Sequence, residues 1–155
     1  MLITMIRVNV FSEDTNWSKK IKNKEIFFNS ICDAFPNKYK FLNKNVDFTL
    51  LLSNNQNIKK LNKKFRNKNK PTDILSFPLS HKISIKKDTY LGDVIISFNY
   101  MSKDKEKRSF KTVVIKTFIH GFLHLLGFDH IKDKDYKKMI LEENKIYKSV
   151  ISKLN

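Results

Sequence analysis

The sequence VDFTLLLSNNQNIKKLNKKF, Val46 to Phe65, contains a strand followed directly by a helix. Its first part, Val46 to Leu52, is a nearly continuous apolar run, which is typical of a strand buried on both faces of a sheet. In its second part, Ile58, Leu61 and Phe65 recur at the spacing of one helix face. The stretch therefore indicates a sheet that is covered by helices.

Strands and helices also flank this unit. Before it, Ile3 to Phe11 predicts a strand, and apolar residues from Trp17 to Phe35 recur at helical spacing until Pro36. After it come two predicted strands, Ile74–Leu79 and Leu91–Ser97. A short helix after Phe98 follows, and then two longer helices, Phe110–Leu126 and Asp133–Ile151. This order predicts an α+β fold with one mixed sheet of about four strands, mostly parallel with an antiparallel edge, packed with about five α-helices. We expect a single domain over residues 1–155.

The composition indicates a globular chain with a large positive charge. Of its 155 residues, 41% are hydrophobic, and 31 Lys and Arg against 15 Asp and Glu give a formal net charge of +16. Such an excess favours polyanionic partners such as RNA. Drift in an A/T-rich coding sequence explains the same excess of lysine equally well, so the charge permits an RNA partner without proving one.

We expect a cytoplasmic protein without a membrane segment. The only cysteine, Cys32, can form no internal disulfide, and the start MLITMIRVNVF lacks the parts of a secretory signal. No apolar run approaches the roughly 18 residues that span a bilayer.

The segment HGFLHLLGFDH, His120 to His130, holds three of the four histidines. His120 and His124 lie four residues apart on a predicted helix, so their imidazoles emerge on one face about one turn apart. Gly127 can end this helix in a left-handed conformation and return His130 to the same ion. Three imidazoles with one open position are the ligand set of a catalytic zinc, whereas a structural zinc usually has four protein ligands. The sequence therefore predicts one Zn²⁺ per chain, although imidazoles also suit nickel, copper and iron.

The same spacing occurs in the zinc-peptidase pattern HExxHxxGxxH. Gly121 stands where that pattern has its glutamate base, so peptide hydrolysis is disfavoured. A glycine inside a helix costs about 1 kcal/mol relative to alanine, and we expect Gly121 to leave space beside the metal. Asp129 either caps a turn or holds a ligand histidine in its correct tautomer, and the second role is favoured. His81 is expected to lie outside the site.

HGFLHLLGFDH resembles the signature HGxLHLxGxDH of the YbeY family of endoribonucleases, the rRNA maturation factors. A second block, LNKKFRNKNKPTDILSFPL from Leu61 to Leu79, resembles that family's LN, YR and PTDVLSFP pattern, with Phe65 in place of Tyr and Ile74 in place of Val. LGDVIIS, Leu91 to Ser97, is similar to the family's LGDIxIS strand. The change at Phe65 removes a hydroxyl and any hydrogen bond that the family's tyrosine makes.

The resemblance implies a zinc-dependent endoribonuclease for single-stranded RNA, active in late ribosome maturation and quality control, including the 3′ end of 16S rRNA. Precursor rRNA and the small ribosomal subunit would be its partners, with no membrane and no DNA. The family's arginine falls on Arg66, which would face the site and contact phosphate, and its Thr and Asp fall on Thr72 and Asp73. A carboxylate on the last helix is also similar, and Glu143 fits its spacing better than Glu142.

These residues predict how RNA would be cleaved. Zinc would activate a nucleophile and polarise the phosphate, while the guanidinium of Arg66 pairs with phosphate oxygens. The sequence leaves open whether water or the neighbouring 2′-hydroxyl attacks. Lysines close to Arg66 in sequence either follow an RNA backbone or are simply solvated: Lys59, Lys60, Lys63, Lys64, Lys68 and Lys70. Two other functions remain open, a non-catalytic ribosome assembly factor with a structural metal and, less favoured, a zinc peptidase.

Overall fold

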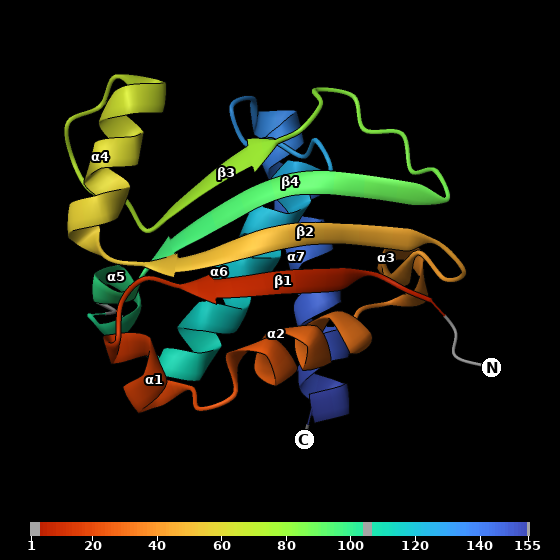
Figure 1. Cartoon of the computed structure of the whole chain (residues 1–155). Coiled ribbons are helices and arrows are strands. Elements are labelled where there is room, and N and C mark those ends of the chain that lie inside the picture. Colours follow the sequence, from red (N-terminus) through yellow and green to blue (C-terminus); the bar gives the residue numbers. More distant parts are fainter. Residues whose placement is uncertain (1–3, 104–106, 155) are drawn as a thin grey trace.

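The computed structural model describes residues 4–103 and 107–154, which form one four-stranded sheet and the helices around it (Figure 1). The strands are β1 (Arg7–Ser12), β2 (Asn45–Ser53), β3 (Ile74–Pro78) and β4 (Asp88–Ser97). The helices are α1 (Asn16–Lys20), α2 (Lys24–Asp33), α3 (Asn37–Lys40), α4 (Asn55–Arg66), α5 (Phe98–Ser102), α6 (Phe110–Leu125) and α7 (Asp133–Leu154). None of the helices in these two ranges has both the length and the apolar character needed to cross a membrane.

The strands lie in the order β1-β2-β4-β3. β1 pairs with β2, and β2 with β4, in parallel, whereas β3 runs antiparallel to β4 at one edge. This arrangement confirms the predicted mixed sheet with an antiparallel edge.

The first third of the chain differs from the prediction. The single helix expected from Trp17 to Phe35 is wrong, because Ile21 has an extended backbone (φ −131°, ψ 109°) and separates α1 from α2. Ile21 is buried while Ile26 is 62% exposed, so the apolar residues of this stretch do not share one helix face. With α3 added, the described residues contain seven helices where about five were expected. The predicted first strand began at Ile3, which lies outside the described residues.

The two faces of the sheet have different cover. On one face, alternate residues of β2 such as Phe48 pack on α6, where the Phe48 and Phe118 rings lie 5.6 Å apart. On the other face, Ile58 of α4 packs on Leu75 and Ile95 of the two strands at the β3 edge. α6 and α7 therefore lie on the side of the sheet opposite α4 (Figure 1).

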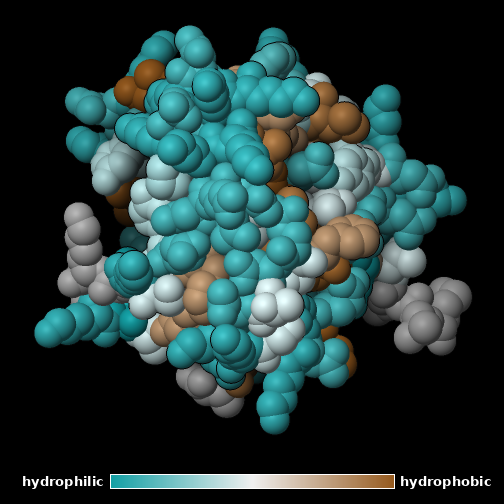
Figure 2. Space-filling view, turned by 60° about the vertical axis from the view of Figure 1, so that its left-hand side comes forward, coloured by the Kyte–Doolittle hydropathy of each residue, from teal (hydrophilic) through white to brown (hydrophobic). Residues whose placement is uncertain are grey.

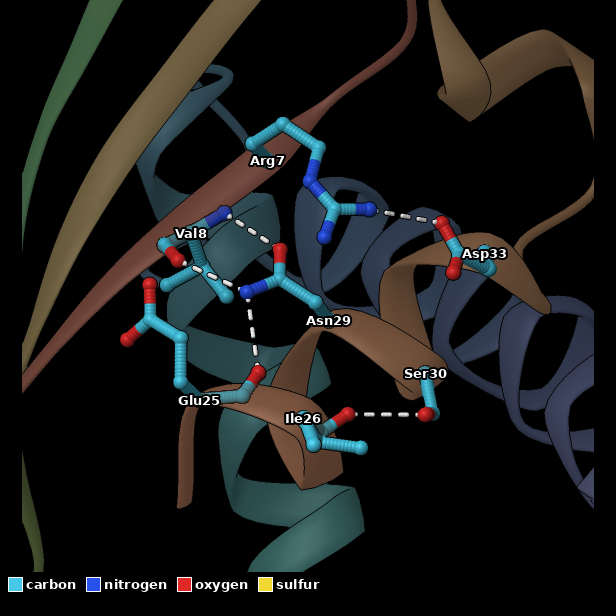
Figure 3. A network of polar contacts seen from close by, with 7 residues as sticks. All are labelled: Arg7, Val8, Glu25, Ile26, Asn29, Ser30 and Asp33. Atoms are coloured by element: carbon cyan, nitrogen blue, oxygen red, sulfur yellow. Dashed lines mark hydrogen bonds and ion pairs between the residues drawn. The ribbon is translucent and has the colours of Figure 1, made fainter. Parts of the chain in front are cut away.

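Asn29 of α2 covers the free edge of β1 (Figure 3). Its Oδ1 accepts a hydrogen bond from the Val8 backbone N–H at 3.0 Å, and its Nδ2 donates to the Val8 carbonyl at 3.0 Å. The pair Arg7–Asp33 adds a surface ion pair at 3.0 Å, which is worth little by itself. An unpaired strand edge invites pairing with another chain, and the buried Asn29 amide occupies this one.

Glu142 of α7 joins α7 to α3. Its carboxylate accepts hydrogen bonds from the Tyr39 hydroxyl and from Lys38 Nζ, and Lys145 Nζ lies 3.2 Å from its second oxygen. The hydrogen bond from Tyr39, followed by those from the two lysines, lowers the pKa of Glu142 from 4.5 to about 2. Because Glu142 is buried, this cluster ties the last helix to the core.

The pKa of Glu142 predicts acid sensitivity. A carboxyl with a lowered pKa in the fold stabilises the protein fully above its unfolded pKa, and that stabilisation is lost as the pH falls towards its folded pKa. Glu142→Gln should therefore lower the free energy of unfolding by up to about 3 kcal/mol at pH 6 and by much less near pH 2–3. Urea titrations of both proteins at pH 6 and pH 3 measure the two differences. If Glu142→Gln lowered the free energy of unfolding equally at pH 6 and pH 3, the lowered pKa of Glu142 would be contradicted.

Candidate metal centre

Three histidine rings converge at the end of α6. His120 and His124 are one turn apart on the helix, and Gly127, with φ +96°, turns the chain so that His130 returns towards them. One ring nitrogen from each histidine lies within 4.8 Å of the other two. The three rings come from one short segment, so the local chain brings them together.

The rings of His120 and His124 point one nitrogen each at the other. His124 Nδ1 lies 2.9 Å from the Phe128 carbonyl, which can only accept, so Nδ1 carries a proton and Nε2 is the free nitrogen. His120 Nδ1 contacts the Glu143 carboxylate, so its Nε2 is the nitrogen that faces His124. The two Nε2 atoms are 3.0 Å apart. Two ring nitrogens at this distance share a cation, either a proton or a metal ion.

His124 is neutral at neutral pH. Its burial, followed by the charges of His120 and His130, lowers the pKa of His124 from 6.5 to about 4. A neutral imidazole is the form that binds a metal ion. At pH 7, protons therefore compete only weakly with a metal ion for the His124 ring.

The donor set fits one tetrahedral ion. Two nitrogens bound to one zinc ion at about 2.0–2.1 Å with tetrahedral angles lie roughly 3.3 Å apart, close to the 3.0 Å between His120 Nε2 and His124 Nε2. His130 is exposed, so the side of the site that it lines is open to solvent. The three rings can thus hold a metal and leave room for a substrate oxygen.

Gly121 does not make space beside the metal, so that expectation is wrong. A Cβ on Gly121 would lie 2.6 Å from Ile74 Cδ1 and 2.8 Å from Val94 Cγ1. Its open side therefore faces the sheet, and the Ser76 hydroxyl donates to its carbonyl at 3.2 Å. The glycine lets α6 approach β3 and β4, which brings the histidines close to the sheet edge.

We expect Gly121→Ala to destabilise the fold and leave the metal affinity unchanged. Overpacking against the stiff Val94 costs about 1–3 kcal/mol, and the better helix propensity of alanine returns about 1 kcal/mol of this. Urea unfolding and a metal competition titration measure the two quantities. A variant that is as stable as the parent but binds metal more weakly would show that the space faces the metal after all.

Two predicted supporting carboxylates behave differently. Glu143, in the middle of α7, reaches His120 directly. Asp129 accepts a hydrogen bond from the His130 backbone N–H at 2.6 Å, as in the turn-capping alternative, and its favoured role as a partner of a ligand ring stays a prediction. Glu142 points away from the site to Tyr39.

Arg66 is the last residue of α4. Figure 2 brings forward the left-hand side of Figure 1, where α4 lies, and hydrophilic residues cover most of the face that it shows. The chain then passes Asn67 in a left-handed conformation and folds back on α4, because the buried Asn62 amide donates to the Lys70 carbonyl at 2.9 Å. The result is a hollow, here called the arginine hollow. It is lined by Arg66, Lys68, Lys70, Thr72 and Asp73, among others.

A second hollow, here called the histidine hollow, lies beside His120. Its volume is about 380 Å³. It is lined by His120, Glu143, Asp73, Arg108, Lys116 and Tyr147, among others. Asp73 lines both hollows, whereas Arg66 lines only the first and His120 only the second. Asp73 therefore separates Arg66 from the metal centre, and Arg66 does not line the histidine hollow. The Thr72 hydroxyl donates a hydrogen bond to the Asp73 carboxylate at 3.2 Å.

Three groups that shape the site were not predicted from the sequence: the Phe128 carbonyl, Lys116 and Tyr147. The Phe128 carbonyl, which orients His124, has no signal in the sequence because a backbone atom carries no residue type. Lys116 lies four residues before His120, and this spacing on a predicted helix is a signal that could have placed it on the same face as the histidines. The same argument applies to Tyr147, four residues after Glu143.

Comparisons with known proteins agree with one another. The family model described as Endoribonuclease YbeY matches residues 10–151. A protein of Pelagibacter ubique named Endoribonuclease YbeY is 60% identical over 152 residues, which cover 97% of this chain and 99% of the relative. A protein of Persephonella marina with the same name is 33% identical, and the matched region covers 87% of this chain and 91% of the relative. The solution structure of TM1509 from Thermotoga maritima shares the fold, with a TM-score of 0.55, 24% identity, and 97% and 91% of the two chains covered.

Proposed function

Because the chain belongs to the endoribonuclease YbeY family, we propose that it is a zinc-dependent endoribonuclease that cleaves single-stranded RNA. The observation that carries this proposal is the convergence of three imidazoles, with the Nε2 atoms of His120 and His124 3.0 Å apart and His130 beside them. Such a group is suited to a metal ion. The whole of residues 1–155 would act as one domain.

A bound zinc ion would supply a nucleophile at neutral pH and polarise a phosphoryl oxygen. The protein residues around it have separate tasks. His120, His124 and His130 would hold the ion, while Glu143 keeps the proton of His120 on Nδ1. The Phe128 carbonyl does the same for His124. Both rings are then oriented before any ligand arrives.

Arg66 would neutralise a phosphate next to the metal centre. A guanidinium presents a planar fork of donors that matches phosphate oxygens. The loop that Asn62 holds to α4 places Lys68 and Lys70 in the same hollow, so this hollow concentrates positive charge. Asp73 lines both hollows, and its carboxylate would repel a phosphate placed directly against it.

The substrate in the cell would be precursor rRNA. We propose that the 3′ end of the 16S rRNA is cleaved on or near the small ribosomal subunit. The net charge of +16 supports a polyanionic partner, and the family name supports an RNA substrate. The compartment would then be the cytoplasm, where ribosomes mature.

Cleavage of a single-stranded RNA that carries the rRNA 3′ extension tests the proposal. We expect zinc-loaded protein to cleave it, a chelator to stop cleavage, and Arg66→Ala to lower the rate by about 100-fold or more, as for the loss of one charge-stabilising donor. Lys60→Ala, on the same helix outside the arginine hollow, is the matched control. Analysis of the product ends identifies the nucleophile, because a 2′,3′-cyclic phosphate means attack by the 2′-hydroxyl. RNA that stays intact with zinc-loaded protein would overturn the proposal.

A further inference from the structure

We infer that Lys116 and Tyr147 form a second phosphate-binding subsite for RNA, in the histidine hollow and outside the hollow that Arg66 lines; this inference rests on the proposed function. Two parallel pairs of residues join α6 to α7 here. Glu143 contacts His120, and Tyr147 contacts Lys116, with Lys116 Nζ 4.8 Å from the centre of the Tyr147 ring. The second pair repeats the first, one turn further from the end of α6.

The position of Lys116 follows from helix geometry. Lys116 precedes His120 by four residues, so the two side chains emerge on the same face of α6 about 6 Å apart along its axis. Both line the histidine hollow. The nucleotide directly beside the scissile phosphate is therefore within reach of the Lys116 ammonium.

Lys116 is available to an anion. Within the described parts of the chain, its ammonium contacts the face of the Tyr147 ring and has no carboxylate partner within 4.0 Å. The carboxylate nearest to this pair in sequence, Glu143, is already engaged by His120. A cation held over a ring is oriented without being neutralised, so Lys116 keeps its full charge for a ligand.

The ligand that fits this subsite is a phosphodiester of single-stranded RNA. The arginine hollow and the histidine hollow both border Asp73, so cations line two neighbouring hollows: Arg66 and Lys70 line one, and Lys116 lines the other beside His120. Single-strand binding proteins use such cationic grooves to follow the backbone without reading the sequence. Tyr147 acts here as a positioning residue that holds Lys116 over the hollow.

The salt dependence of RNA binding tests this subsite. The probe is a single-stranded RNA with 2′-O-methyl and phosphorothioate groups, bound to the zinc-loaded protein and checked for intact length afterwards. Each phosphate contact to a single strand contributes about 0.7 to the slope of log affinity against log salt. Lys116→Ala should lower the slope by about 0.7, so that the affinity ratio of parent to variant changes about threefold between 50 and 200 mM salt.

Matched variants separate this subsite from general charge effects. Lys111→Ala, on the same helix and over the Phe27 ring, lies outside both hollows and should leave the slope unchanged. Lys116→Arg and Tyr147→Phe should keep the slope, whereas Tyr147→Leu should weaken binding at low salt. Equal slopes for Lys116→Ala and the parent, with cleavage intact, would overturn the subsite alone. Failure of the parent to cleave RNA would overturn the proposed function and leave the slope comparison valid.

Discussion

Replacing His124 with alanine is expected to lower RNA cleavage by about a thousandfold or more and to remove the bound metal. His124 supplies one of the two facing Nε2 atoms, and its burial lowers its pKa so that the ring is in the neutral form that binds a metal ion. Without it, His120 and His130 would leave the ion with two protein ligands, too few for a zinc site. Cleavage rates and the metal content of the purified variant measure the two losses.

His81→Ala is the matched control, because His81 is exposed and is not part of the three-histidine group. The comparison also separates a catalytic metal from a structural one. A His124→Ala protein that is folded, binds RNA and is inactive supports catalysis, whereas an unfolded one supports an assembly factor with a structural metal. Because metal binding itself stabilises the fold, the stability of the variant is compared with that of the parent in chelator.

Glu143→Gln is expected to weaken metal binding by about 10–100-fold, with a smaller effect on folding. The Glu143 carboxylate holds the Nδ1 proton of His120 and raises the basicity of its Nε2, and a neutral amide does this less well. Competition with a metal-binding dye measures the dissociation constant. Glu142→Gln, the same substitution one residue earlier, contacts Tyr39 and should leave metal affinity unchanged. Equal metal affinities for the two variants would remove Glu143 from the metal centre.

Local spacing predicted the histidine group because one helix and one turn determine it. The separation of His120 and His124 by four residues places both on one face, and Gly127 has the left-handed conformation that returns His130. The sheet was also predictable, because each strand has its own apolar run. The strand boundaries differ from those expected mainly at the ends, as for β4, which begins at Asp88 instead of Leu91.

Tertiary contacts explain what local patterns missed. A glycine inside a helix was expected to leave space beside the metal. A helix turns by about 100° per residue, so the Cβ position of Gly121 faces Val94 and not the side of His120. Ile21 continued an apolar spacing, yet its burial required an extended backbone that ends α1. The separation of Arg66 from His120 by Asp73 depends on how α4 and α6 lie on opposite faces of the sheet, which no local pattern encodes.

The most direct test of the three-histidine centre is X-ray absorption at the metal edge of zinc-loaded protein. Three imidazole nitrogens and at least one non-protein light atom are expected at about 2.0–2.1 Å from one zinc ion per chain. The His124→Ala protein should lose this signal. A zinc shell with no imidazole, or one completed by a fourth protein side chain, would contradict an open catalytic metal centre.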